Sequence, residues 1–168
     1  MIAILNADKN WGIGSAGDQP FYIPEDLKFF MTKTLGNVVI MGRATLEALP
    51  KKKPLPKRTN IVLTRQKGFE ADGATICHDF DGLFEELRRH DKEQVFVIGG
   101  AEVYHALLPH CTKVYVTKIF AEAACDRHFP NLDEMPEWHI TDASEIKNHL
   151  GLEYCFYTYE RMSDIDGD

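Results

Sequence analysis

Residues 95–104 read Val95-Phe96-Val97-Ile98-Gly99-Gly100-Ala101-Glu102-Val103-Tyr104. The first four are aliphatic or aromatic and are typical of a strand buried on both faces, and a helical pattern follows the two glycines. Glycines at such a junction let a diphosphate or a ring approach the backbone closely. The segment lacks the complete G-x-G-x-x-G fingerprint, so by itself it is weak evidence for a dinucleotide site.

A second junction has the same order. Val38-Val39-Ile40-Met41 continues into Gly42-Arg43-Ala44-Thr45, again a buried strand, a glycine and a helix, here with a cation beside the glycine. Free N–H groups at a helix start and an arginine favour an anion such as phosphate, although a plain turn with a surface arginine explains the segment equally well. Two such junctions in one sheet are stronger evidence together, because ligands gather at the carboxyl ends of parallel strands.

The remaining apolar runs continue the alternation of strands and helices. Strands are expected at 2–6, 37–41, 60–64, 74–77, 94–98 and 113–119, and helices at 25–35, 43–49, 81–90 and 101–108. Two extended stretches near the end, 139–143 and 153–160, predict an antiparallel hairpin at the sheet edge. The expected class is therefore α/β, with a mainly parallel sheet and about four helices.

The composition of the chain limits the classes of function that are expected. The chain has 168 residues, and 19 basic against 26 acidic residues give a formal charge of −7, which disfavours nucleic acid as a general partner. It has no run of 18 apolar residues and no signal-peptide pattern, so we expect no membrane partner and a cytoplasmic location. Its four cysteines and seven histidines have no metal-ligand spacing, so we predict reduced thiols and no metal site. We expect one domain over 1–161, a flexible acidic tail over 162–168, and a monomer.

The segment Pro24-Glu25-Asp26 begins a helix, with proline in the first turn and two acids where the helix dipole favours negative charge. This structural role accounts for both carboxylates. At about 100° per residue, however, only Asp26 lies beside the apolar stripe of the helix, so only Asp26 is expected to face the interior. The stripe consists of Leu27, Phe30 and Met31. A carboxylate in that position has a raised cost of ionisation and is suited to bind a polar heterocycle.

Other groups suited to anions lie beside strands. Leu63-Thr64-Arg65 ends a strand with a hydroxyl and a guanidinium, which suit a phosphate monoester such as the 2′-phosphate of NADPH. Arg58 directly precedes a strand and is suited to hold a carboxylate bidentately, whereas the lysines before it are expected to lie in a solvated loop. Residues 11–20 contain three glycines and predict an irregular, mobile lid, to which 126–130 are expected to form hydrogen bonds.

Taken together, these segments resemble dihydrofolate reductase, and the match runs in order through nearly the whole chain. It rests on Trp11-Gly12-Ile13-Gly14, Pro20, Pro24-Glu25-Asp26-Leu27, Phe30, Val39-Ile40-Met41-Gly42-Arg43-Ala44-Thr45, Pro54-Leu55-Pro56-Lys57-Arg58-Thr59-Asn60, Ile98-Gly99-Gly100, Tyr104, Tyr115-Val116-Thr117 and Asp126. The resemblance implies a three-layer fold around a central, mostly parallel eight-stranded sheet. It also implies NADPH as the cofactor and hydride donor, 7,8-dihydrofolate as the substrate, and sensitivity to antifolates.

The resemblance further assigns roles to residues. The catalytic residues would be Asp26, which binds the amino-pyrimidine edge of the pterin, and Thr117, which supports it. The substrate-binding set is Asn6, Asp26, Leu27, Phe30, Arg58, Ile98, Tyr104 and Thr117. The cofactor-binding set is Ala7, Ile13, Gly14, Gly42, Arg43, Ala44, Thr45, Leu63, Thr64, Arg65, Ile98, Gly99, Gly100, Ala101, Glu102, Val103 and Tyr104. In this family the Gly-Gly peptide at the first junction is cis, and Arg58 takes the glutamate carboxylate of the substrate.

Four positions differ from the commoner choices of the family. These are Asn6 for a small alanine, Gln19 for an aliphatic residue, Phe21 for tryptophan and Glu102 for an arginine near the cofactor. They bear on affinity and inhibitor sensitivity rather than on the reaction. In that reaction hydride reaches C6 of the pterin while N5 gains a proton, and Asp26 would fix the ring and favour its protonated form, with water as the alternative proton carrier.

Two alternatives remain open at this point. An NADPH-dependent pyrimidine reductase of riboflavin synthesis has the same fold and explains the glycine junctions, but it does not explain Asp26 together with Thr117 and Arg58. A catalytically silent nucleotide-binding protein also explains the junctions, and it requires that Asp26 be dispensable.

Overall fold

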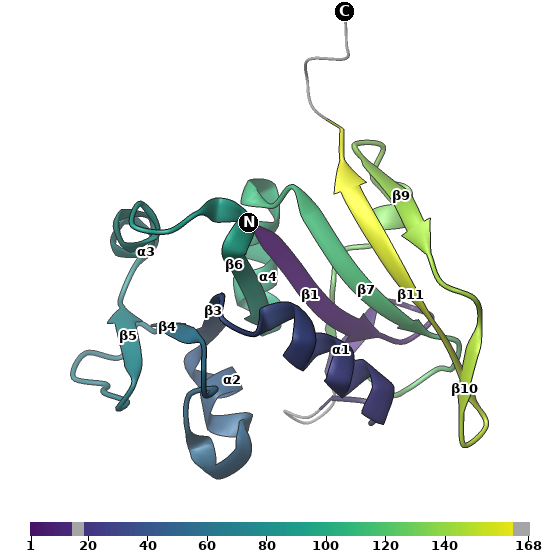
Figure 1. Ribbon diagram of the computed structural model, residues 1–168, viewed down its shortest axis with the longest axis horizontal. Coiled ribbons are helices and arrows are strands. Elements are labelled where there is room, and N and C mark those ends of the chain that lie inside the picture. Colours follow the sequence, from purple (N-terminus) through teal and green to yellow (C-terminus); the bar gives the residue numbers. More distant parts are fainter. Residues whose placement is uncertain (15–18, 163–168) are drawn as a thin grey trace, which may run out of the picture.

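The computed structural model describes residues 1–14 and 19–162 as a twisted sheet with helices on both faces (Figure 1). The strands of this sheet are β1 (Ile2–Ala7), β3 (Val38–Gly42), β4 (Thr59–Leu63), β5 (Ala74–Cys77), β6 (Val95–Gly99), β7 (Lys113–Ile119), β9 (Trp138–Ala143), β10 (Lys147–His149) and β11 (Leu152–Arg161). The α-helices are α1 (Pro24–Thr34), α2 (Arg43–Ala48), α3 (Phe80–Leu87) and α4 (Ala101–Leu107). Short 3₁₀ turns occur at Pro50–Lys52, Lys92–Gln94, Leu108–His110 and Leu132–Glu134.

The strand order is β10-β11-β7-β1-β6-β3-β4-β5, and β9 pairs with β11 outside this path. All pairs from β7 to β5 are parallel, whereas β11 is antiparallel to β7, β9 and β10. The expected mostly parallel sheet with an antiparallel C-terminal hairpin is confirmed, with the expected eight strands in this order and β9 as a ninth. The hairpin differs from the expectation in one respect, since the short strand β10 lies between the two expected stretches and forms the tight turn with β11. This turn consists of Leu150 and Gly151, whose φ angles of 51° and 89° suit a two-residue turn.

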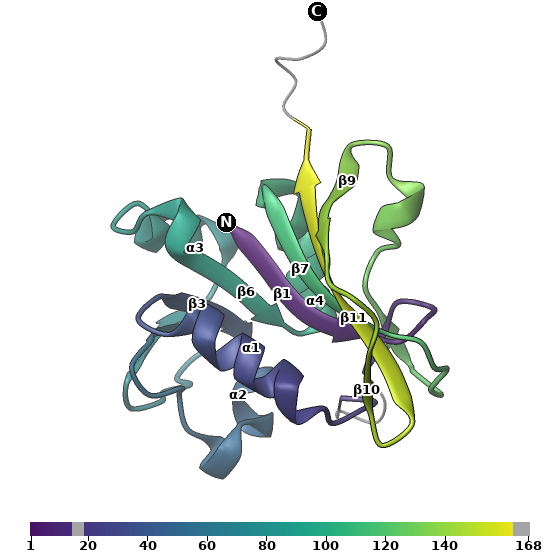
Figure 2. The ribbon, with the colours of Figure 1, turned by 45° about the vertical axis from the view of Figure 1, so that its right-hand side comes forward.

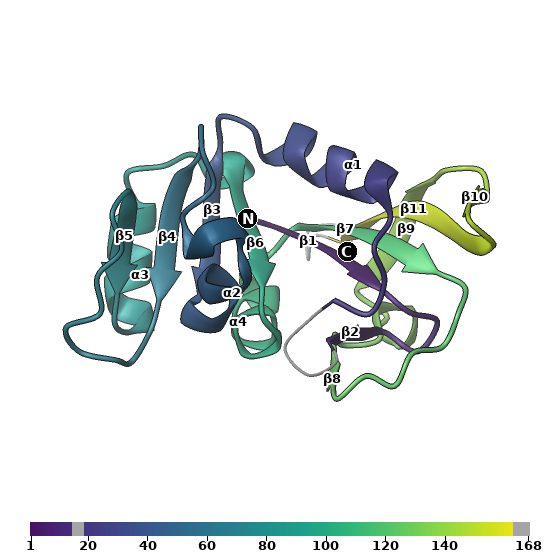
Figure 3. The same ribbon diagram turned by 90° about the horizontal axis from the view of Figure 1, so that it is seen from below.

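Alternation along the central strands divides the core into two layers. Ala3 and Leu5 point to the face that packs against α3 and α4, and Ile2 and Ile4 point to the other face. Phe29 and Phe30 of α1 and Leu46 of α2 pack into that second layer. The sheet is thus covered on both sides, which explains why its strands are almost continuously apolar (Figure 3).

Two segments differ from the sequence-based expectation. Residues 11–20 were expected to be irregular, but β2 (Gly12–Gly14) forms a small sheet with β8 (Arg127–His128). The predicted hydrogen bonds to this segment are confirmed, since Asp126 N donates to Gly14 O at 2.9 Å and Phe129 N donates to Trp11 O at 2.8 Å. The helix expected at 81–90 is α3, which ends at Leu87. The N–H groups of residues 88–90 donate to carbonyls three residues earlier, not four, so these residues do not continue the α-helix. The rest of the predicted lid, 15–18, and the predicted tail from 163 lie outside the described residues.

The described chain has no helix that is both long and apolar enough to cross a bilayer. Three of the four cysteines, Cys77, Cys111 and Cys155, are buried free thiols, and Cys125 is a half-buried free thiol.

Candidate active site

Asp26 lies in the first turn of α1, which crosses one face of the sheet (Figure 2). The helix begins after Ile23, an N-cap residue with no side-chain hydrogen bond, and Pro24 occupies the first turn. The side chain of Asp26 points to the sheet and meets β1 and β7. Thr117 Oγ1 donates to Asp26 Oδ1 at 2.6 Å, and Asn6 Nδ2 donates to Asp26 Oδ2 at 2.9 Å. The predicted pairing of Asp26 with Thr117 is therefore present, and Asn6 joins it.

Burial controls the ionisation of this carboxyl. Loss of solvent raises the pKa of Asp26 above its ordinary value, and the hydrogen bonds from Thr117 and Asn6 act in the opposite direction. Both donors are themselves buried. The result is a carboxylate whose charge is supported by hydrogen bonds, since the described residues give Asp26 no salt bridge.

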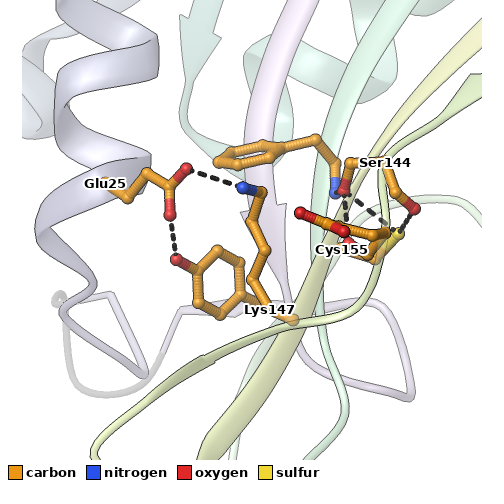
Figure 4. A network of polar contacts seen from close by, with 7 residues as sticks. Glu25, Ser144, Lys147 and Cys155 are labelled. Atoms are coloured by element: carbon orange, nitrogen blue, oxygen red, sulfur yellow. Dashed lines mark hydrogen bonds and ion pairs between the residues drawn. The ribbon is translucent and has the colours of Figure 1, made fainter.

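The neighbouring acid, Glu25, points instead toward Lys147 (Figure 4). It accepts a hydrogen bond from the hydroxyl of Tyr154 on β11 and forms an ion pair with Lys147 Nζ on β10 at 3.1 Å. The prediction from helical phase that Asp26 and Glu25 face different surroundings is confirmed. The partners of Glu25 come from the last strands of the chain, so local sequence contains no signal for them.

The other predicted substrate residues lie at different depths. Phe30 and Ile98 are half-buried against the layer under α1, whereas Leu27 is 47% exposed. Tyr104 is buried on α4, and its hydroxyl donates to the carbonyl of Ile4 at 2.8 Å. Direct contact of these four residues with a substrate remains a prediction.

Arg58 lies against the last turns of α1. Its guanidinium donates to Met31 O at 2.5 Å, to Thr34 Oγ1 at 3.2 Å and to Pro56 O at 2.7 Å. Nη2 also lies 3.8 Å from Met31 Sδ, so each of the three guanidinium nitrogens has a partner in the protein. The protein therefore holds the guanidinium in one orientation.

The two glycine junctions meet on neighbouring strands. Met41 of β3 is paired with Gly99 of β6, so Gly42 and Gly99 end their strands side by side. Gly99 has a φ of +129°, and a Cβ there would lie 3.4 Å from Thr45 Oγ1. The predicted cis peptide between Gly99 and Gly100 is present. Because glycine has no side chain, the peptide N–H and C=O groups of Gly99 and Gly100 are accessible to a ligand that lies across both strand ends, and Thr45 lies beside them.

The residues predicted to bind phosphate are less closely grouped than the two glycine junctions. Arg43 forms an ion pair with Glu47 one turn further along α2, at 2.8 Å, and Arg65 is exposed after the end of β4. Thr64 Oγ1 accepts from Gln66 N at 3.1 Å. Sequence reasoning missed His78, whose Nδ1 lies 3.0 Å from Thr64 O. The parallel pairing of β4 with β5 brings these two residues together, and that pairing is not visible in the sequence.

Sequence reasoning also missed Asp8, which anchors the segment carrying Ile13 and Gly14. Its carboxylate is buried and accepts from the backbone N–H groups of Asn10, Gly12 and Ala123 at 2.8, 2.7 and 3.0 Å. Burial acts to raise the pKa of Asp8, but these three hydrogen bonds outweigh it and hold the pKa below its ordinary value. The remaining residues of the predicted cofactor set lie near the strand ends; Ala7 and Val103 are buried, Leu63 and Ala101 half-buried, and Ala44 and Glu102 exposed.

Comparison with known proteins agrees with this geometry. The family model for dihydrofolate reductase matches residues 1–161. The chain belongs to the dihydrofolate reductase family. It is 36% identical to the dihydrofolate reductase of Bacillus subtilis, with 99% of both chains covered, and 37% identical to that of Mycobacterium tuberculosis, with 96% of this chain and 98% of the relative covered. The solved structure of dihydrofolate reductase from Enterococcus faecalis, complexed with NADP(H) and RAB-propyl, is similar with a TM-score of 0.85 at 32% identity, covering 96% of each chain.

Membership of the dihydrofolate reductase family confirms the resemblance drawn from the sequence, together with an NADPH-dependent oxidoreductase activity on a C=N bond. The alternative of a pyrimidine reductase of riboflavin synthesis is not favoured by these comparisons.

Proposed function

We propose that this chain reduces 7,8-dihydrofolate to 5,6,7,8-tetrahydrofolate, with Asp26 as the residue that binds and orients the pterin. The observation that carries the proposal is the carboxylate of Asp26, in which each oxygen accepts one hydrogen bond from the protein. A carboxylate has about four acceptor positions, so both oxygens keep room for a further donor. The amino-pyrimidine edge of a pterin presents two parallel N–H donors, which match this pair of oxygens.

Asp26 also contributes to proton movement. Reduction of a neutral imine at carbon leaves negative charge on the nitrogen, so N5 of the pterin must gain a proton in the same step or before it. A carboxylate held in a partly buried site favours the protonated, positively charged ring, because the interaction between the two charges is stronger there than in water. Thr117 keeps the carboxylate in place through its short hydrogen bond.

The residues at the strand ends fit NADPH. When bound, NADPH supplies the hydride for this reduction. Gly99 and Gly100 leave space between their backbone and the side chain of Thr45. A Cβ would occupy part of that space, because it would lie 3.4 Å from Thr45 Oγ1 at Gly99 and 3.6 Å from it at Gly100. These residues would hold the diphosphate and the adjacent part of the cofactor, and Thr64 and Arg65 would hold the 2′-phosphate. Arg65 would compensate for the lack of a basic residue at the position of the exposed Glu102.

Arg58 supplies the contact for the far end of the substrate. A guanidinium suits the glutamate carboxylate of dihydrofolate, and the bonds of Arg58 to α1 and Pro56 would keep it oriented for that contact. We further propose that residues 1–161 form one catalytic domain that acts as a monomer in the cytoplasm.

The test is a spectrophotometric assay of NADPH oxidation by the purified protein with and without dihydrofolate. We expect oxidation to require dihydrofolate, and Asp26→Asn to reduce turnover by about 100-fold or more while NADPH binding persists. Glu25→Gln is the matched control, because it removes a charge from the same helical turn outside the site. Oxidation that is independent of dihydrofolate, or an Asp26→Asn variant as active as Glu25→Gln, would contradict the proposal.

A further inference from the structure

We propose that Asn6 is a positioning residue for the reaction: together with Thr117 it fixes both oxygens of the Asp26 carboxylate and so sets the plane that the carboxylate presents to the pterin. This inference rests on the proposed function.

The geometry comes from the register of two strands. Asn6 of β1 and Thr117 of β7 are directly paired neighbours, so their side chains leave the same face of the sheet side by side. Each donates to a different oxygen of Asp26, at 2.9 Å from Asn6 Nδ2 and 2.6 Å from Thr117 Oγ1. The terminal torsion of an aspartate is broad and two-fold, so one bond leaves the carboxylate free to turn. Two bonds to opposite oxygens prevent that rotation.

The orientation of the Asn6 amide follows from the chemistry of its partner. An ionised carboxylate only accepts hydrogen bonds, so the amide must present its NH₂ group to Asp26. Asn6 Nδ2 also lies 3.4 Å from Gln19 Oε1, a second and more distant acceptor. This leaves Asn6 Oδ1 buried and without a partner among the described residues.

That unpaired carbonyl indicates a role beyond packing. Asn6 is only 6% exposed, and an unpaired buried acceptor costs stability that an aliphatic side chain of the same size would not. The amide has one property that an aliphatic residue lacks, because a half-turn exchanges its donor and acceptor. When Asp26 is ionised the NH₂ group donates to it, and when Asp26 is protonated Oδ1 can accept its O–H. Asn6 can therefore hold Asp26 in both protonation states, and it holds the ionised one more strongly, because a hydrogen bond to a charged group is stronger than one between neutral groups.

No cation replaces this support in the described structure around Asp26. The titratable groups within electrostatic reach of it are the hydroxyls of Tyr104 on α4 and Tyr154 on β11, which donate to Ile4 O and to Glu25. Glu25 on α1 is turned to Tyr154 and to Lys147 on β10. The hydrogen bond from Asn6 lowers the pKa of Asp26 against the larger effect of burial. Loss of the Asn6 donor must therefore raise that pKa further.

The test measures the Asp26 carboxyl directly, by carbon-13 NMR titration of the ligand-free protein. We expect the pKa of Asp26 to rise by about one unit in both Asn6→Ala and Asn6→Leu. The leucine variant keeps most of the side-chain volume, so it separates loss of the donor from loss of packing. Gln19→Ala, which removes only the weak second acceptor, is the control and should leave this pKa unchanged. An unchanged pKa in both folded Asn6 variants would overturn the inference.

Two further readouts complete the test. In the unaltered protein the side-chain amide of Asn6 should titrate with the same midpoint as Asp26, because its partner changes from acceptor to donor; an amide signal that ignores the Asp26 titration would also overturn the inference. In turnover, the pH profile of kcat/KM for dihydrofolate should shift upward in the Asn6 variants. Because the titrations need no substrate, a protein that fails to reduce dihydrofolate contradicts the proposed function without altering the NMR result.

Discussion

Glu25 and Tyr154, which are 129 residues apart in the sequence, are joined by a hydrogen bond that ties the first turn of α1 to β11. Burial raises the pKa of Tyr154 to about 12, and the bond to Glu25 is the second cause, so the hydroxyl remains a donor at neutral pH. Lys147 adds an ion pair to the same carboxylate. The residue next to Asp26 thus holds the start of the helix while Asp26 faces the site.

Removal of this hydrogen bond should weaken the fold. We expect Tyr154→Phe to lower the free energy of unfolding by about 1 kcal/mol, since the bond is to a charged group that is partly exposed. The bonds from Tyr154 and then Lys147 hold the pKa of Glu25 below its ordinary value of 4.5, so this stabilisation is present above that pH and is lost as the pH falls. Urea unfolding at neutral and acidic pH measures both effects. Tyr22→Phe, at a side chain that is 68% exposed, should change neither.

Asp26 should reduce stability at neutral pH. Its pKa is raised by burial above the ordinary 3.8, so the folded state binds the proton more tightly than the unfolded state does. The stabilisation linked to this proton is present below that value and is lost as the pH rises through the higher, folded-state pKa. Asp26→Asn should therefore raise the melting temperature at neutral pH and have a smaller effect in acid. A variant that melts lower than the parent at neutral pH would contradict this sign.

Arg58 should act on the substrate's glutamate and not on its ring. We expect Arg58→Lys to raise KM for dihydrofolate about tenfold, because lysine cannot offer two parallel donors from a planar group. The same variant should leave KM unchanged for a reduced pteridine without the aminobenzoyl-glutamate part. Equal losses with both substrates would show instead that the bonds from Arg58 to Met31 and Thr34 position α1.

Arg65 should select the cofactor. We expect Arg65→Gln to lower kcat/KM for NADPH about tenfold and to leave kcat/KM for NADH unchanged, because the two cofactors differ only in the 2′-phosphate. Lys67→Gln, also exposed and basic two residues later, is the matched control and should have little effect. An equal loss with both cofactors would mean that Arg65 does not contact that phosphate.

Much of the fold follows from local pattern. Apolar runs placed β1, β3, β4, β5, β6 and β7 within about two residues of their observed limits, because continuous burial on both faces requires such runs. The small sheet of β2 and β8 was missed, because it pairs a glycine-rich segment with a polar one and neither has the alternation of a half-buried strand. Asp8 adds a contact between distant residues, because its carboxylate accepts from Gly12 N in β2 and from Ala123 N shortly before β8.

The candidate site divides in the same way. Helical phase, which depends only on neighbouring residues, was enough to predict that Asp26 and not Glu25 faces the interior, and the strand–glycine–helix order predicts where a nucleotide would lie. Only the tertiary structure decided which groups hold Asp26, because the pairing of β1 with β7 brings Asn6 and Thr117 to the same place on the sheet. Register between strands distant in sequence is set by the packing of the whole core, so no local pattern contains it.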